Sequence, residues 1–152
     1  MKDGIDLTEL DDEKLPMPIP ADWVPGPKQG HWTYNDYAAV DDEKRYEIVN
    51  GVLFLIPTPW SSHQKAVGGV FYYLFTHIEA THIGHLYIGP LDLELAPDTV
   101  LQPDVLLVLN TELDKLTDTH VIGAPDLVVE VSSPGTIGYE RREKQDAYAL
   151  AG

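Results

Sequence analysis

The sequence predicts a mixed α/β domain, because it combines two continuous apolar runs with one long amphipathic segment. Residues 105–109 and 127–131 are rich in Val and Leu, as is typical of buried strands. Residues 61–82 instead repeat their apolar side chains at helical spacing. Strands with a helix packed on them belong to the mixed class, and 152 residues are enough for one such domain with its own core.

The first 30 residues are predicted to form an extended arm ahead of a domain at residues 31–152. The arm is acidic and then rich in Pro and Gly, a composition that disfavours regular structure. After the arm, Thr33 is placed to cap a short helix over residues 34–40.

An Asn-Gly pair indicates a β-hairpin. Asn50 and Gly51 separate two apolar segments, residues 46–49 and 52–56. This dipeptide between apolar runs is the strongest short signal for a type I′ turn, so both segments are expected to be antiparallel strands.

The long helix is expected to begin with Ser61 or Ser62 as its cap and to end near His82. Its apolar side chains follow helical spacing: Val67, Val70, Phe71, Leu74, Phe75 and Ile78. Gly68 and Gly69 weaken the helix and suggest close packing there. The aromatic residues Phe71, Tyr72, Tyr73 and Phe75 favour the core or a subunit interface over a base-stacking platform.

The second half of the chain contains further strands and a final helix. Leu91, Leu93 and Leu95 alternate with acidic residues, which predicts a half-exposed strand. The apolar strands at 105–109 and 127–131 follow, and residues 139–151 are predicted to be helical.

The carboxylate Glu130 lies inside the apolar run at 127–131. Burying an ionised carboxylate is costly unless a cationic side chain, a raised pKa or a metal ion compensates it. Glu130 therefore points either to a metal site or to a structural ion pair with Lys144 or Arg141.

Three Pro-Asp pairs offer a second carboxylate, at Asp98, Asp104 and Asp126. Asp98 lies in a predicted turn. Asp126 precedes Glu130 by four strand residues, roughly 13 Å, which is too far for both to reach one ion at about 2.1 Å. Asp104 opens a strand that can pair beside the Glu130 strand, so these two form the best pair. Their oxygen ligands favour Mg²⁺ or Mn²⁺ over Zn²⁺.

The charge of the chain limits its possible partners. The net charge of −15 argues against general nucleic-acid binding, which requires Lys and Arg for the phosphates. The sequence contains no cysteine, no apolar run long enough to span a membrane and no apolar signal segment at its start. We therefore expect a cytoplasmic protein without a membrane partner.

Several stretches, in this order and spacing, resemble the PD-(D/E)XK nuclease superfamily and, within it, the restriction endonuclease family called Uma-two. The matching stretches are residues 45–51, 57–64, 98–104, 124–131 and 143–152, and the resemblance covers roughly residues 30–152. It implies a restriction-endonuclease-like core, with a mixed central sheet flanked by helices. It also implies a further strand after residue 152, so the domain is expected to be shortened at its C-terminal end.

The resemblance implies a role for each matching residue. Asp104, Glu130 and the Val131 carbonyl would bind the metal, and Glu47 would complete the acidic cluster. The superfamily places a Lys two residues after the Glu, where this chain has Ser132. Lys144 matches the position to which this family is thought to have moved that lysine.

These features favour a metal-dependent DNA endonuclease that acts as a homodimer, with Glu47, Asp104, Glu130 and Lys144 as catalytic residues and Mg²⁺ or Mn²⁺ as cofactor. Substrate contacts are expected from His63, Ser132, Arg141 and Tyr148. The alternative is a catalytically inactive nuclease-fold module that binds or assembles proteins, which the acidic charge favours. A metal-dependent RNA nuclease is a third, weaker alternative.

Overall fold

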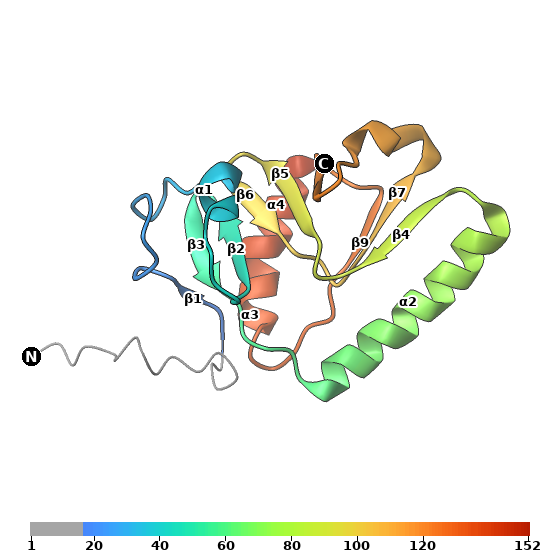
Figure 1. Ribbon diagram of the computed structural model, residues 1–152. Helices are drawn as coiled ribbons and strands as arrows, with labels where there is room; N and C mark the ends of the chain where they lie inside the picture. The colour runs from blue at the N-terminus through green and yellow to red at the C-terminus, as the bar shows by residue number, and fades with distance from the viewer. Residues whose placement is uncertain (1–16) are drawn as a thin grey trace, which may run out of the picture.

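The computed structural model describes residues 17–152, apart from the side chains of residues 140 and 141, and its strands form two sheets (Figure 1). The strands are β1 (Ile19–Pro20), β2 (Tyr46–Val49), β3 (Val52–Leu55), β4 (Gly84–Ile88), β5 (Asp92–Ala96), β6 (Thr99–Leu101), β7 (Val105–Leu109), β8 (His120–Ile122) and β9 (Leu127–Val129). The first sheet has the order β1-β3-β2-β6-β5-β8 and the second has the order β4-β7-β9. Strands β5 and β8 run parallel while their neighbours run antiparallel, which confirms the predicted mixed fold class.

Helical segments connect and cover the sheets. They are α1 (Tyr34–Ala38), α2 (Ser61–Thr81), the 3₁₀ helix η3 (Asn110–Lys115), α3 (Ile137–Tyr139), the π-helical turn η4 (Glu140–Lys144) and α4 (Gln145–Ala151). The continuous run from α3 to α4 lies against the first sheet, whereas α2 extends along the second sheet (Figure 1). No helix in the described part of the chain is long and apolar enough to cross a membrane.

The Asn-Gly hairpin is confirmed. Asn50 and Gly51 have φ values of 50° and 74°, the two positive angles that a type I′ turn requires. Strands β2 and β3 pair antiparallel around this turn, from Val49 opposite Val52 to Tyr46 opposite Leu55. All four residues of β2 are buried, so this strand is central to the domain.

Residues 17–30 pack on this hairpin although they contain little regular structure. Strand β1 pairs with β3, and the Ala21 amide donates to the Leu53 carbonyl at 2.8 Å. Ala21 and Trp32 are buried in one core cluster with Tyr46. The remainder of the predicted arm, residues 1–16, lies outside the described residues.

The core lies on both faces of the first sheet and between the two sheets. A second cluster joins Val49 and Leu101 of the first sheet to Tyr139 and Ala147 of the C-terminal helical run. A third joins strands β5 and β8 to strand β7 of the second sheet through Leu93, Val121, Leu106 and Val108. Burial of these side chains therefore fixes the second sheet and the C-terminal helices relative to the first.

Helix starts are partly as expected. Thr33 forms a capping box with Asp36, as predicted for the start of α1, and α1 ends at Ala38. The predicted serine cap of α2 is wrong, because Trp60 occupies the N-cap position and no side chain caps this end. The helix ends as predicted at His82, which adopts a left-handed conformation with φ 50°.

Two expectations about burial are also wrong. A methyl group added at Gly68 or Gly69 would meet no atom within 4 Å, so these glycines face open space instead of a packed neighbour. The strand at residues 127–131 is shorter and less buried than expected: β9 ends at Val129, and Leu127 is exposed. The reason is that β9 is the end strand of its sheet and pairs with β7 on one side only within residues 17–152.

We predict that Gly51→Ala destabilises the protein more than Gly30→Ala does. Both glycines have positive φ, so both substitutions carry backbone strain. A Cβ at Gly51 would also lie 2.4 Å from the Gly30 carbonyl oxygen, whereas one at Gly30 would meet nothing within 4 Å. Urea denaturation should give an additional loss of at least about 1 kcal/mol for Gly51→Ala. Equal losses would contradict the importance of this contact.

Candidate functional site

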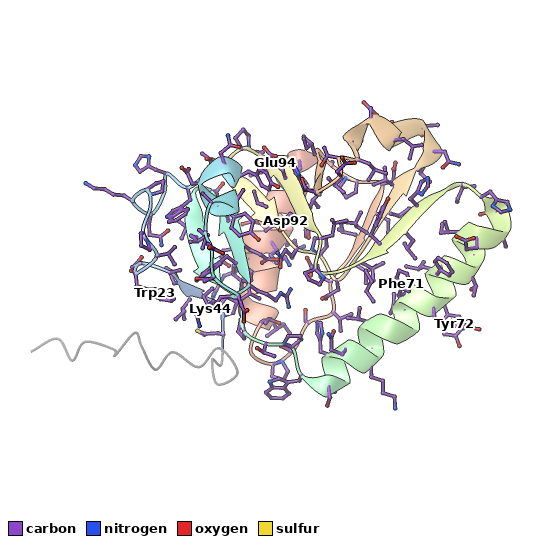
Figure 2. All side chains as sticks on the ribbon, in the orientation of Figure 1. Trp23, Lys44, Phe71, Tyr72, Asp92 and Glu94 are labelled. Atoms are coloured by element: carbon purple, nitrogen blue, oxygen red, sulfur yellow. The ribbon has the colours of Figure 1, made fainter. Side chains whose placement is uncertain are left out.

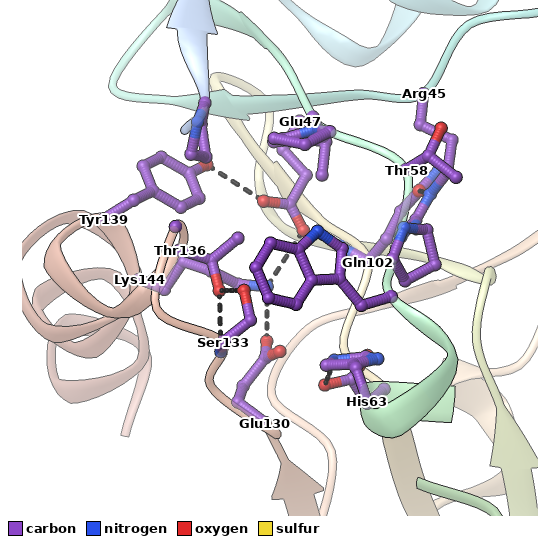
Figure 3. A pocket seen from close by; sticks show the side chains of 17 residues that line it. Arg45, Glu47, Thr58, His63, Gln102, Glu130, Ser133, Thr136, Tyr139 and Lys144 are labelled. Carbon is purple, nitrogen blue, oxygen red and sulfur yellow. Dashed lines mark hydrogen bonds and ion pairs between the residues drawn. The ribbon is translucent and has the colours of Figure 1, made fainter. Parts of the chain in front are cut away.

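A cleft opens where the two sheets, the start of α2 and the C-terminal helical run meet (Figure 3). Its lining combines charged or polar side chains with a Pro-rich segment. The principal lining residues are Arg45, Glu47, Pro57, Thr58, Pro59, Trp60, His63, Gln102, Asp104, Glu130, Ser133, Thr136, Tyr139 and Lys144. All four predicted catalytic residues lie here: Glu47, Asp104, Glu130 and Lys144.

The centre of the cleft is an ammonium group held between two carboxylates. Lys144 Nζ lies 2.9 Å from Glu47 Oε1 and 2.5 Å from Glu130 Oε1, so it lies between the two acids (Figure 3). The Lys144 side chain is only 5% exposed. Two negative charges share one positive charge, which leaves this buried group with a net charge of −1 when both acids are ionised.

Glu47 is the most thoroughly fixed member of this group. Its side chain is 2% exposed, because β2 lies in the middle of the first sheet. Besides Lys144, Oε1 accepts the backbone N–H of Gln102 at 2.8 Å, and Oε2 accepts the Tyr139 hydroxyl at 2.9 Å. These contacts occupy both oxygens of Glu47, so its role in this structure is to hold Lys144.

Burial and charge shift the titration of these groups. Burial raises the pKa of Glu130 to about 7, even though the Lys144 ammonium opposes the shift. Burial alone would lower the pKa of Lys144, but Glu47 and Glu130 outweigh it and raise that pKa above its usual value. Burial, reinforced by Glu47, likewise raises the pKa of Tyr139. Lys144 therefore stays cationic at neutral pH, while Glu130 exchanges its proton in that range.

Asp104 lies directly opposite Glu130 on the neighbouring strand. Strands β7 and β9 pair Val105 with Val129, and one further step of this antiparallel register brings Asp104 beside Glu130. Asp104 Oδ2 accepts the Val131 amide at 2.7 Å, and His63 Nε2 lies 3.2 Å from the same oxygen. His63 belongs to the first turn of α2, so this helix start lies against the carboxylate pair.

The carboxylates Asp104 and Glu130 fit a Mg²⁺ or Mn²⁺ site in which the protein supplies only a few of the ligands. Within residues 17–152, no three His, Cys, Asp or Glu side chains lie close enough to enclose a metal ion. Mg²⁺, however, is usually held by one or two carboxylates together with water and substrate phosphate. Asp104 and Glu130 provide that donor set, and an unpartnered buried nitrogen, His63 Nδ1, lies in the same cleft.

The other predicted contact residues lie in different places. Ser132 is exposed and does not line the cleft, although the adjacent Ser133 does. Tyr148 is also absent from the lining, and its hydroxyl donates to Glu130 Oε1 at 2.6 Å, so it orients that carboxylate. The side chain of Arg141 lies outside the described residues. The backbone amide of Val131 contacts Asp104, while the predicted role of its carbonyl stays a prediction.

Several cleft residues were not singled out by sequence reasoning. Tyr139 was predicted only as the start of the last helix, and Trp60 lies in the matching stretch 57–64 without a role of its own. Arg45 belongs to the Arg-Tyr-Glu stretch that ends in Glu47, and its Nε donates to Gln102 Oε1 at 3.3 Å. The matching stretches 45–51 and 57–64 were the available signals for Arg45 and Trp60, whereas no local pattern connects Tyr139 with a carboxylate 92 residues away.

Comparisons with known proteins identify relatives of this chain. A model of the Uma2 family, described as "Putative restriction endonuclease", matches residues 33–152. A crystal structure from Anabaena variabilis, described as a "putative nuclease belonging to DUF820", is similar in fold with a TM-score of 0.65. Its sequence is 16% identical, and the match covers 79% of this chain and 69% of that chain. No curated protein matches the chain.

We predict that Glu130→Gln changes how stability depends on pH. The folded-state pKa of Glu130, about 7, exceeds its ordinary value of 4.5, so between these values the folded protein binds a proton that the unfolded chain releases. Glu130 therefore contributes stability at low pH that is lost as the pH rises to 7. From pH 4.5 to 8 without metal, urea denaturation should show the wild type losing roughly 3 kcal/mol relative to Glu130→Gln. Parallel stability curves would contradict the assigned shift.

We also predict that Lys144→Met destabilises the protein severely. Removing the ammonium leaves Glu47 and Glu130 buried without their shared counter-charge, which typically costs about 3–5 kcal/mol. Lys115→Met is the matched control, since Lys115 pairs with Glu112 on the surface and should matter much less. Chemical denaturation at pH 8 measures both, and similar losses would show that the buried triad is not a stabilising unit.

Proposed function

Because the chain belongs to the Uma2 family, we propose that it is a metal-dependent endonuclease that hydrolyses phosphodiester bonds in DNA. The observation that supports this most directly is the cluster of Asp104, Glu130 and Lys144 in one cleft, assembled from three separate parts of the chain. The related fold of the Anabaena variabilis protein, itself described as a "putative nuclease", agrees with this proposal.

In this proposal Asp104 and Glu130 hold a Mg²⁺ or Mn²⁺ ion. When bound, the ion supplies a Lewis acid for the phosphate oxygens and an acidified water. The Tyr148 hydroxyl, which lies outside the cleft lining, orients Glu130 through a hydrogen bond, and the Val131 amide orients Asp104 in the same way. The cleft therefore presents two carboxylates whose positions are set by hydrogen bonds before any ligand arrives.

Lys144 contributes charge to the reaction, since its raised pKa keeps it protonated at neutral pH. An ammonium in that state donates to developing negative charge on the phosphate but does not remove a proton from water. Glu47 and Tyr139 fix the position of this ammonium through Glu47 Oε1 and Oε2. Arg45 and His63 also line the cleft and would contact the phosphates beside the scissile bond.

The second candidate function is a nuclease-fold module that binds or assembles proteins without cleaving DNA. The net charge of −15 favours it, and so does the ion pairing of Lys144, which is already shared between two acids. Among the residues that line the cleft, Arg45 and Lys144 are the Lys or Arg side chains available for phosphate. We rank it second because surface protein binding does not require the carboxylates of the cleft.

We predict that wild-type protein binds Mg²⁺ or Mn²⁺ and nicks plasmid DNA, and that Glu130→Gln and Asp104→Asn lose both properties. Each substitution removes one charged ligand, and the nicking rate should fall by at least about 100-fold. Calorimetric titration of each metal, run beside a nicking assay, measures the two effects on the same samples.

Asp126→Asn is the matched control for this experiment. Asp126 also follows a proline, but it is exposed, accepts the Leu109 amide at 2.8 Å and does not line the cleft. It should therefore bind metal and nick DNA as the wild type does. Absence of metal binding, together with a Glu130→Gln variant at least as stable as wild type, would instead support the module.

A further inference from the structure

Helix α2 has two faces of different character. One side packs on the domain through the buried Val67 and Ile78 and the half-buried Val70, Phe71 and Leu74. Figure 2 shows Phe71 on the side of α2 that faces the sheet and Tyr72 on the outer side, pointing away from the domain. Tyr72 is 63% exposed, which is unusual for a large aromatic side chain on a single surface helix.

The outer side of α2 carries one continuous stripe of exposed residues. Lys65, Tyr72 and Glu79 are spaced by seven residues, so they follow one another along the helix with a drift of only about 20° per step. Gly68 and Gly69 lie one turn before Tyr72, and Phe75 and Thr76 lie one turn after it. We call these residues, from Lys65 to Glu79, the Tyr72 face.

The Tyr72 face is complementary to the same face of a second copy whose α2 runs in the opposite direction. Lys65 lies seven residues before Tyr72, and Glu79 lies seven residues after it. Gly68, where an added Cβ would meet nothing within 4 Å, lies four residues before Tyr72, and Phe75 lies three residues after it on the same side of the stripe. The Phe75 ring is stacked on Phe71 at a centroid distance of 5.5 Å, so it is held at the edge of this face.

We propose that the Tyr72 face is a homodimer interface in which α2 helices of two copies pack antiparallel around a two-fold axis at Tyr72. In this arrangement Lys65 of each copy meets Glu79 of the other, and the Phe75 ring of each copy enters the gap above Gly68 of the other. A parallel arrangement would instead oppose Lys65 with Lys65 and Glu79 with Glu79. Antiparallel packing also aligns the helix dipoles favourably. A second copy therefore fits this face in charge, shape and symmetry.

The size of the contact sets its expected strength. At 1.5 Å per residue, the stripe from Lys65 to Glu79 is about 21 Å long. One helix pair of this length lies near or below the roughly 1,200 Å² at which standard stable interfaces begin. We therefore expect a dimer that dissociates on dilution.

The proposed dimer also determines how far apart the two clefts lie. His63 precedes Tyr72 by nine residues, so the two His63 residues would lie at opposite ends of the helix pair, about 27 Å apart along the helices. This distance is of the same order as one turn of duplex DNA, about 34 Å. The consequence for DNA cleavage depends on the proposed function, whereas the interface itself does not.

The test is the oligomeric state of charge-reversal variants, measured by sedimentation velocity from about 1 μM to about 500 μM, a range suited to a weak interface. The wild type should dimerise across this range. Lys65→Glu and Glu79→Lys should each raise the dimer Kd at least about fivefold, because each creates two like-charge contacts. The double variant Lys65→Glu/Glu79→Lys should regain the wild-type Kd, and an equimolar mixture of the two single variants should form heterodimers.

Two further variants test the fit around the axis. Gly68→Leu should prevent dimerisation by filling the gap that receives Phe75, while an unchanged thermal unfolding midpoint or a higher one shows that the helix is intact. Tyr72→Cys should crosslink to a second copy with a short bis-maleimide, since the chain has no other cysteine. Tyr73→Cys is the matched control, because Tyr73 is 75% exposed but lies outside the Tyr72 face, and it should crosslink poorly.

Three outcomes would overturn the proposal: a monomer at every concentration, a dimer that tolerates Gly68→Leu and both charge reversals, or equal crosslinking at positions 72 and 73. A monomer would show that this face does not bind a second copy, and an insensitive dimer would place the interface elsewhere. None of these readouts depends on metal or cleavage, so failure of this proposal and failure of the nuclease proposal are distinguishable.

Discussion

The Lys144 ammonium, shared between Glu47 and Glu130, is the interaction on which the arrangement of this domain depends. Glu47 comes from the middle of the first sheet, Glu130 follows the last strand of the second sheet, and Lys144 comes from the C-terminal helical run. The three elements therefore meet at one buried charge. Because two acids share a single cation, removing Lys144 would leave both acids without a counter-charge in a poorly solvated place, whereas removing either acid would leave one balanced ion pair.

The same constraint supports the proposed binding of a cation at this site. A buried group with a net charge of −1 is unfavourable, and the protein relieves it by raising the pKa of Glu130 to about 7. A divalent ion beside Asp104 and Glu130 would relieve it in another way, by displacing that proton. The hydrogen bonds from Tyr139, Tyr148 and the Val131 amide hold the carboxylates in place for either state. The net charge of −1 in this buried group therefore affects both the stability of the domain and the proposed binding of a cation.

Helix α2 connects the cleft with the outer surface of the domain. Its first turn brings His63 against Asp104, and its inner side packs on the domain through Val67 and Ile78. Its outer side remains exposed and carries aromatic and charged residues that nothing in the described part of the chain covers. One helix therefore reaches the candidate active site at its start and carries, along its length, the surface that we propose for a second copy.

Local sequence patterns determined the elements of this protein. The Asn50-Gly51 turn, the Thr33 cap and the strand at Val105–Leu109 each follow from backbone preferences or side-chain periodicity, which act over a few residues. The choice of Asp104 over Asp126 was also local, since strand geometry separates Asp126 from Glu130. The family resemblance added Glu47 and Lys144, which no pattern within a single element would have selected.

Only the tertiary structure decided how these elements are covered and which side chains meet. The sequence could not show that Gly68 and Gly69 face open space, because an amphipathic pattern does not reveal how much of a helix is covered. It could not show that β9 is an end strand with Leu127 exposed, since that depends on sheet order. Nor could it connect Tyr139 to Glu47 or Tyr148 to Glu130, because these contacts join distant parts of the chain. Short-range backbone preferences are encoded residue by residue, whereas burial and charge pairing depend on which distant segments share the same space.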